Sequence, residues 1–156
     1  MKYSELHYER IDVDVSRKLM QGMVERLNSA STFDEHLKVI KNVDQFNRDY
    51  ASYAAMASLN FSRDIHDEGA KAEKEYYDSI GPDMMECLEI YDKAINNSKY
   101  KVEISNKLGE TFIKQVEMSL KTFDPKIKKM LKEETVLRNR YTKLTAGAQI
   151  NYEGKK

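Results

Sequence analysis

The sequence predicts an all-α protein, an elongated antiparallel bundle of about five helices followed by a short carboxy-terminal strand. Apolar residues recur every three to four positions through most of the 156 residues, which is the spacing of one buried helix face. Only two prolines occur and 33% of the residues are charged, as is typical of helical proteins. One uninterrupted helical pattern, residues 32–65, would span roughly 50 Å, which is longer than a compact domain of this size.

Residues 3–11 form an irregular or extended segment ahead of the first helix. Their apolar side chains partly alternate, which indicates a segment lying along a groove between helices; these are Tyr3, Leu6, Tyr8 and Ile11. Asp12 or Asp14 then caps a helix that ends within residues 28–31. Its expected buried face consists of Val15, Leu19, Met23 and Leu27, widened by Met20 and Val24.

The second helix begins at Thr32, which forms a capping box with Glu35. Its expected buried face consists of Phe33, Leu37, Ile40, Val43, Tyr50, Ala54, Ala57, Phe61 and Ile65. Small side chains let helix backbones approach closely. The closest helix crossing is therefore expected at Ala51, Ser52, Ala54, Ala55, Ala57 and Ser58.

The third helical region runs from about residue 70 to residue 95 and contains Gly81-Pro82. Because proline removes an amide donor, we expect either a kink or two abutting helices at this point. The apolar pattern keeps its phase across the proline, so no domain boundary is expected here. The expected buried face consists of Tyr76, Ile80, Met84, Leu88, Tyr91 and Ile95.

Two further helices complete the bundle. The fourth covers residues 101–121, with Gly109 as a weak point, and is expected to bury Ile104, Leu108, Phe112, Val116 and Leu120. The fifth opens at Asp124-Pro125, because proline is well tolerated in the first helical turn. Its expected buried face consists of Ile127, Met130, Leu131, Leu137, Tyr141 and Leu144.

The pattern changes after Ala148, where Ile150 and Tyr152 alternate with polar residues as in a strand. No other segment offers this strand a partner, and an unpaired strand leaves its backbone groups without ladder bonds. We therefore predict a helical amino-terminal lobe, residues 1–148, and a truncated strand, residues 149–156, that leads into a missing domain.

The composition bounds the partners and the compartment. The 26 basic and 26 acidic side chains cancel, so neither nucleic acid nor an anionic membrane is an expected partner. Cys87 is the single cysteine; it is expected to be a small buried residue and is compatible with a reducing compartment. The chain starts without a secretory signal, and no apolar run approaches about 20 residues. We expect a cytoplasmic protein.

The residues by themselves indicate no catalytic or metal site, and substrate-binding residues are unknown. His7, His36 and His66 are each expected to be surface or half-buried rings, since none has the spacing of a zinc helix. The acidic cluster in residues 64–68 has metal-ligand side chains but matches no calcium loop, so it is expected to be solvated. Glu86, Glu89 and Asp78 are expected to be surface carboxylates that line a cleft only if the helices diverge.

Several blocks of the sequence together resemble the amino-terminal region of the oligoendopeptidase F family of zinc metallopeptidases, relatives of thimet oligopeptidase. They occur in the family's order and span essentially the whole chain. The blocks are Tyr3-Ser4-Glu5-Leu6 with Tyr8-Glu9-Arg10, Glu75-Tyr76-Tyr77-Asp78 with Ile80-Gly81-Pro82, Leu120 through Ile127, and Tyr141-Thr142-Lys143-Leu144 running to Ile150-Asn151-Tyr152-Glu153-Gly154.

The resemblance implies a helical lobe that walls a channel for short peptides, facing a catalytic domain that holds zinc in a His-Glu-x-x-His helix. No His-Glu-x-x-His occurs in these residues, so the resemblance assigns no catalytic or metal residue to any position, and no cofactor to this chain. A free-standing helical module that binds a peptide or protein is the alternative. Self-association is also expected, through the carboxy-terminal strand or the face of the long second helix.

Overall fold

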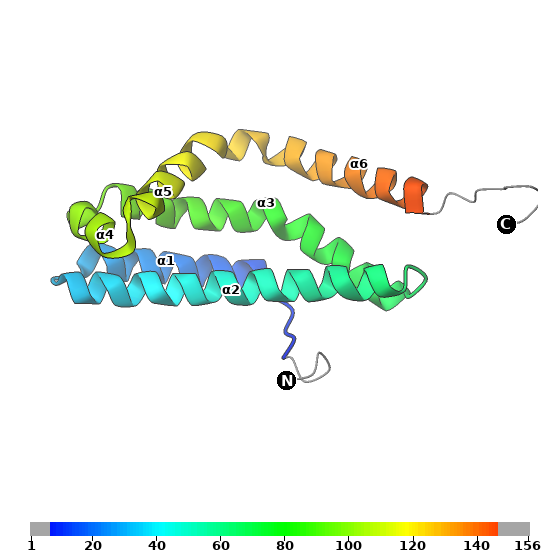
Figure 1. Ribbon diagram of the computed structural model, residues 1–156, viewed down its shortest axis with the longest axis horizontal. Coiled ribbons are helices and arrows are strands. Elements are labelled where there is room, and N and C mark those ends of the chain that lie inside the picture. The colour runs from blue at the N-terminus through cyan, green and yellow to red at the C-terminus, as the bar shows by residue number, and fades with distance from the viewer. Residues whose placement is uncertain (1–6, 147–156) are drawn as a thin grey trace, which may run out of the picture.

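The computed structural model describes residues 7–146, and over that range the chain folds into six α-helices and one short 3-10 helix (Figure 1). The all-α prediction is confirmed, whereas the predicted strand in residues 149–156 lies outside the described residues. The elements are α1 (Val13–Ser29), α2 (Phe33–Arg63), α3 (Glu68–Asn96), α4 (Lys101–Leu108), α5 (Glu110–Thr122), η2 (Pro125–Ile127) and α6 (Lys128–Ala146).

The helix α3 lies at the centre of the bundle, because α1, α2, α5 and α6 all pack against it. The helices α1 and α2 run antiparallel beneath it, α4 and α5 close one end, and α6 returns along the opposite side (Figure 1). With 31 residues, α2 is about 46 Å long at the usual rise per residue. The bundle is elongated for this reason, as the sequence predicts.

Polar side chains fix where the first three helices begin. Asp12 caps α1 by accepting from the backbone N–H of Val15, and Asp67 caps α3 in the same way. The predicted capping box at Thr32 and Glu35 is present at the start of α2. These contacts satisfy amides that have no partner inside the helix.

The helix α3 is continuous through Pro82, which is buried, and it changes direction part-way along its length (Figure 1). The structure therefore contains one bent helix and not two abutting helices. For residues 101–121 the sequence predicts a single helix, whereas the structure contains two. Gly109 has a φ of 93°, a conformation that glycine adopts without strain, and the chain breaks there into α4 and α5.

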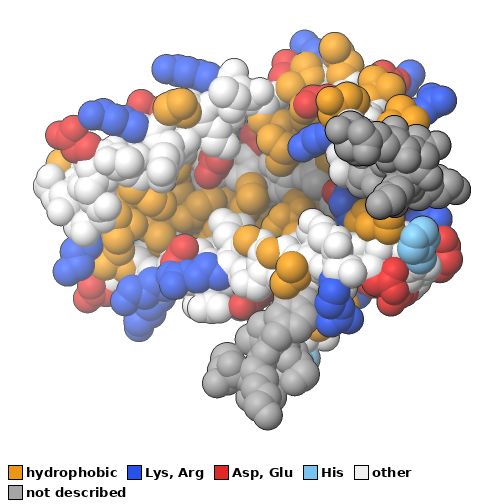
Figure 2. Space-filling view, turned by 45° about the vertical axis from the view of Figure 1, so that its right-hand side comes forward, with side chains coloured by type: hydrophobic (Ala, Val, Ile, Leu, Met, Phe, Trp, Pro, Cys, Tyr) orange, Lys and Arg blue, Asp and Glu red, His pale blue; other side chains and the backbone are white. Residues whose placement is uncertain are grey.

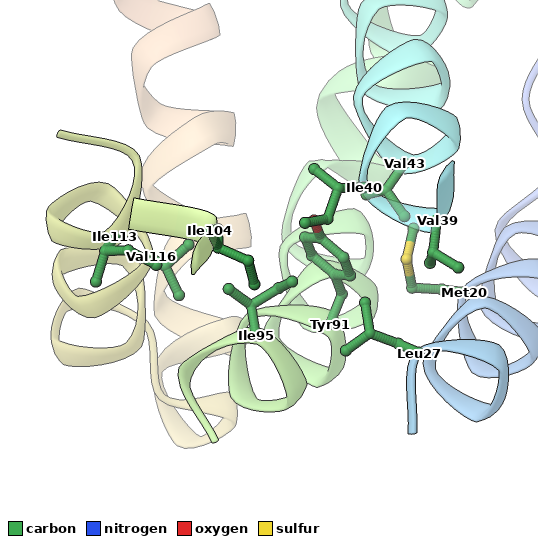
Figure 3. Packing of buried hydrophobic residues seen from close by; sticks show 10 residues of the cluster. All are labelled: Met20, Leu27, Val39, Ile40, Val43, Tyr91, Ile95, Ile104, Ile113 and Val116. Atoms are coloured by element: carbon green, nitrogen blue, oxygen red, sulfur yellow. The ribbon is translucent and has the colours of Figure 1, made fainter. Parts of the chain in front are cut away.

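Two hydrophobic clusters form the core. The larger one joins α1, α2 and α3 to α4 and α5, with Tyr91 and Ile95 of α3 in its middle (Figure 3). The smaller one contains Ala57, Tyr77, Ile80 and Met84, and it holds Tyr8 and Ile11 against the helices. The expectation that the lead-in lies along a groove is therefore confirmed for its described part, which begins at residue 7.

The predicted buried faces are partly wrong in several helices. In α1 the buried face is rotated about the helix axis relative to the predicted one. Val15, predicted to be buried, is 64% exposed, and Leu19 is also exposed. The buried residues are Ser16, Met20 and Leu27. In α2 the small residues do not form one crossing surface. Ala57 is buried and Ala54 is half-buried, but the remaining four face solvent: Ala51, Ser52, Ala55 and Ser58. Ile65 and Leu108, also predicted to be buried, are exposed as well.

Candidate functional site

The described residues contain no group of three or more His, Cys, Asp and Glu side chains placed to hold a metal ion. The zinc ion that the family resemblance implies belongs to a His-Glu-x-x-His helix, and that motif does not occur in these 156 residues. Cys87 is fully buried, as predicted, beside the Arg17 side chain of α1. No helix within residues 7–146 is both long enough and apolar enough to cross a membrane.

The acidic cluster at the α2–α3 turn serves the helix ends. The side-chain oxygen Oδ1 of Asp64 accepts from the N–H of His66 at 2.9 Å, and Oδ1 of Asp67 accepts from the N–H of Ala70 at 3.0 Å. Glu68 pairs with Lys71 at 2.8 Å. Each carboxylate thus has a local structural partner.

The histidine prediction fails at His36, which is only 2% exposed. Its Nε2 lies 3.0 Å from the Ser98 hydroxyl, and the ring packs edge-on against Tyr100. Burial lowers the pKa of His36, and the charge of Lys99 lowers it further, so the ring is held neutral. Periodicity alone could have placed it inside, because His36 precedes Ile40 and Val43 by four and seven residues.

A hydrophobic groove runs along α3 between α2 and the pair α5–α6, and Figure 2 shows it as a hollowed apolar band between two ridges. We call it the α3 groove. It consists of two adjoining hollows that share Met85 and Leu88. The larger hollow, about 420 Å³, lies between Tyr50 of α2 and Leu131 of α6. Both Tyr77 and Asp78 line it, so the helices do diverge at this point.

The smaller hollow of the groove, about 280 Å³, lies where α2, α3 and α5 meet. We call it the α5 hollow. Aromatic rings of Tyr91, Phe112 and Phe123 line it together with the polar side chains of Asn47 and Asp92. Burial raises the pKa of Asp92, a hydrogen bond from Ser119 opposes that rise, and the charge of Glu89 adds to it.

A third hollow, about 460 Å³, opens between the α2–α3 turn and the end of α6. Phe61 and Ile65 supply its apolar wall. Its charged side chains pair with one another, as Lys71 does with Glu68, and Lys143 with Glu75 at 3.0 Å. Because these four side chains pair with one another, none of them presents an unpaired charge to the hollow.

Tyrosines connect the start of the described chain to α3. The hydroxyl of Tyr8 donates to Glu73 at 2.6 Å, and the hydroxyl of Tyr77 donates to the Glu9 carbonyl at 3.0 Å. The Tyr76 hydroxyl donates to the carbonyl of Ile11. Burial, and then the hydrogen bond to Glu73, raises the pKa of Tyr8 far above its ordinary value. These phenols hold the start of the described chain against α3.

The buried face predicted for the last helix is wrong. In α6, Met130, Leu137, Tyr141 and Leu144 are between 64% and 69% exposed, and only Ile127 of η2 and Leu131 are half-buried. The helix is held to α3 by polar side chains instead. Lys128 and Lys132 reach Asp83 at 2.6 and 2.8 Å, and Asn139 donates to Asp78 at 2.6 Å.

Comparison with known proteins identifies the family. A family model described as the peptidase M3 N-terminal domain matches residues 3–123. Two solved structures, Pz peptidase A with an inhibitor and a protein described as an oligoendopeptidase F, each share 28% sequence identity with this chain and a TM-score of 0.92. A third, described as an oligoendopeptidase F from Bacillus anthracis str. Ames, shares 24% identity with a TM-score of 0.93 and supports the fold.

Each match covers 99% of this chain but only 27–28% of the solved structure. A search of curated proteins found no match. Because the family model covers most of the sequence, we conclude that the chain belongs to the peptidase M3 family and corresponds to its N-terminal domain.

Proposed function

We propose that the chain is the amino-terminal helical lobe of an oligoendopeptidase F-like zinc metallopeptidase of the cytoplasm. In this proposal residues 1–148 wall a channel that admits short peptides, and residues 149–156 lead into the domain that follows. Catalysis and zinc binding belong to that domain, since no His-Glu-x-x-His occurs in these 156 residues.

The exposed apolar face of α6 carries the proposal. Met130, Leu137, Tyr141 and Leu144 all face solvent in the structure, and a monomer seldom exposes a large apolar surface without a partner for it. A following domain would cover this face. The solved relatives offer the material for such a domain, because this chain spans about 27% of their length.

The chain's own residues can contribute shape and polarity to such a channel. The α3 groove offers an apolar floor, formed by Met84, Met85 and Leu88, with Asp78 and Arg138 at its edge. Such a wall orients a peptide and limits its size while the reacting groups lie elsewhere. The zinc ion, when bound in the following domain, would supply the activated water.

The gene beyond the codon for Lys156 tests the proposal directly. We expect an open reading frame of several hundred codons that contains a His-Glu-x-x-His helix. The encoded full-length protein should cleave short peptides in a chelator-sensitive manner and leave folded proteins intact. The 156-residue chain alone should do neither and should bind no stoichiometric zinc. Chelator-sensitive peptide cleavage by the 156-residue chain would contradict the proposal.

A free-standing interaction module is the second candidate, and the α3 groove favours it. An apolar groove between helices is a common binding surface for peptides and helices. A stop codon directly after Lys156 would support this candidate over the first.

A further inference from the structure

We propose that the α5 hollow binds the side chain of an arginine presented by a short peptide. The inference takes the peptide as ligand from the proposed function, but the hollow itself consists only of described residues. Its size fits one side chain, because at about 280 Å³ it lies just below the range of pockets that enclose whole small-molecule ligands.

The charge of the hollow selects a cation. Asp92 is the one charged side chain among the described residues that line it, and no lysine or arginine is among them. The neighbouring carboxylates are paired, Glu89 with Lys93 at 2.9 Å and Asp44 with Arg48, whereas Asp92 takes part in none of the described ion pairs. A guanidinium group entering the hollow therefore meets one carboxylate that no lining cation already neutralises.

Two acceptors in the hollow have capacity for further donors. The side-chain oxygen of Asn47 is buried and accepts no hydrogen bond from the described residues. The Asp92 carboxylate accepts from Ser119, but a carboxylate offers about four acceptor positions. A buried acceptor without a donor costs free energy. A ligand donor that reaches the Asn47 oxygen removes this cost, and this adds to the free energy of binding.

The walls distinguish arginine from a small amine. Phe112, Phe123 and Tyr91 present aromatic surface to the hollow, and Met85 and Leu88 continue that surface into the rest of the groove. Such a lining packs against the apolar stem of a long cationic side chain. A planar guanidinium also stacks on aromatic faces and carries five donors in a fixed fork. Its several donors suit a hollow in which the Asp92 carboxylate is the charged acceptor.

Two peptides test the inference, Ac-Ala-Ala-Arg-Ala-Ala-amide and the same peptide with citrulline, which keeps the shape of arginine and removes its charge. Binding to the isotope-labelled protein is followed by NMR, with the side-chain amide signals of Asn47 and Gln115 as reporters inside the hollow. We expect the arginine peptide to bind at least tenfold more tightly and to shift both signals.

Asp92→Asn removes the charge while keeping an oxygen that can accept from Ser119, and we expect it to abolish the preference for arginine. Glu103→Gln is the matched control, because it removes one acidic charge from an exposed position on α4 and should leave the preference intact. Circular dichroism and the melting temperature of each variant check that it folds.

Three results would overturn the inference: equal binding of the two peptides, no binding of either, or a preference that survives Asp92→Asn. The inference and the proposed function can fail independently of each other. A stop codon after Lys156 would remove the proposed peptidase without altering this measurement, and a catalytic domain could follow a lobe that shows no preference for arginine.

Discussion

The helices α1–α3 and the helix α6 are held in place by different forces. In the first group, side chains such as Met20, Val43 and Ile95 are almost fully buried, so the hydrophobic effect supplies most of the stability. In α6 no described side chain is buried, and the contacts with α3 are ion pairs and hydrogen bonds through Lys128, Lys132 and Asn139.

The difference explains what hydrophobic periodicity can and cannot predict. A stripe of apolar residues indicates that a helix has an apolar face. It does not indicate whether another helix of the same chain packs against that face. The stripe of α3 is covered by α1 and α2, whereas the stripe that includes Leu137 and Leu144 on α6 faces solvent.

The largest expected effect on the free energy of unfolding is at the centre of the core, compared with the exposed face of α6. Ile95→Ala should lower the free energy of unfolding by about 2–5 kcal/mol, because it removes a fully buried side chain and leaves a cavity. Leu137→Ala on the exposed face of α6 should change it by no more than about 0.5 kcal/mol. Urea denaturation at low protein concentration measures both, and equal losses would show that α6 is part of the cooperative core.

The next effect concerns what covers α6 in solution. We expect concentration-dependent self-association through its exposed face, detected by sedimentation velocity, since exposed apolar patches pair when nothing else covers them. Leu137→Lys should weaken association by about tenfold, which corresponds to about 1.4 kcal/mol. Val102→Lys is the control, because Val102 is equally exposed but lies on α4. A strict monomer up to about millimolar concentration, or an equal loss with Val102→Lys, would contradict the expectation.

Much of the fold was predictable because local signals and burial agree there. The starts of the first two helices follow from Asp12 and from the capping box at Thr32, and the core positions Ile80, Met84 and Ile95 follow from spacing. The break at Gly109 was noted only as a weak point, since glycine permits a positive φ without requiring it.

The candidate site was less predictable, because it depends on which helices become neighbours. Asn47, Asp92 and Ser119 come from three helices and share no motif in the sequence. The spacing within α2 is enough to place His36 on the buried face, but its partners Ser98 and Tyr100 lie more than 60 residues further along the chain. Neither those partners nor the lining of the α5 hollow can be read from the spacing within one helix.

The smallest expected effect tests whether α6 is attached to α3 mainly by charge. Burial raises the pKa of Asp83, but hydrogen bonds from Lys128 and Lys132, together with their charges, outweigh it and hold the pKa below its ordinary 3.8. A carboxyl whose pKa is lower in the attached state contributes its full stabilisation above that ordinary value. The contribution is then lost as the pH falls through the lowered pKa.

We therefore expect α6 to loosen from α3 below about pH 4, and Asp83→Asn to loosen it already at pH 7. The loss should be about 1 kcal/mol, as for partly exposed ion pairs. Spin labels on Ser62→Cys of α2 and Arg140→Cys of α6, both at exposed positions, report the separation of the two helices by pulsed electron paramagnetic resonance. Glu133→Gln is the control, because Glu133 pairs only along α6 with Lys129 among the described ion pairs. A distance distribution that stays narrow in Asp83→Asn at pH 7 would show that packing of Leu131 and Ile127 holds the helix, and that charge is secondary.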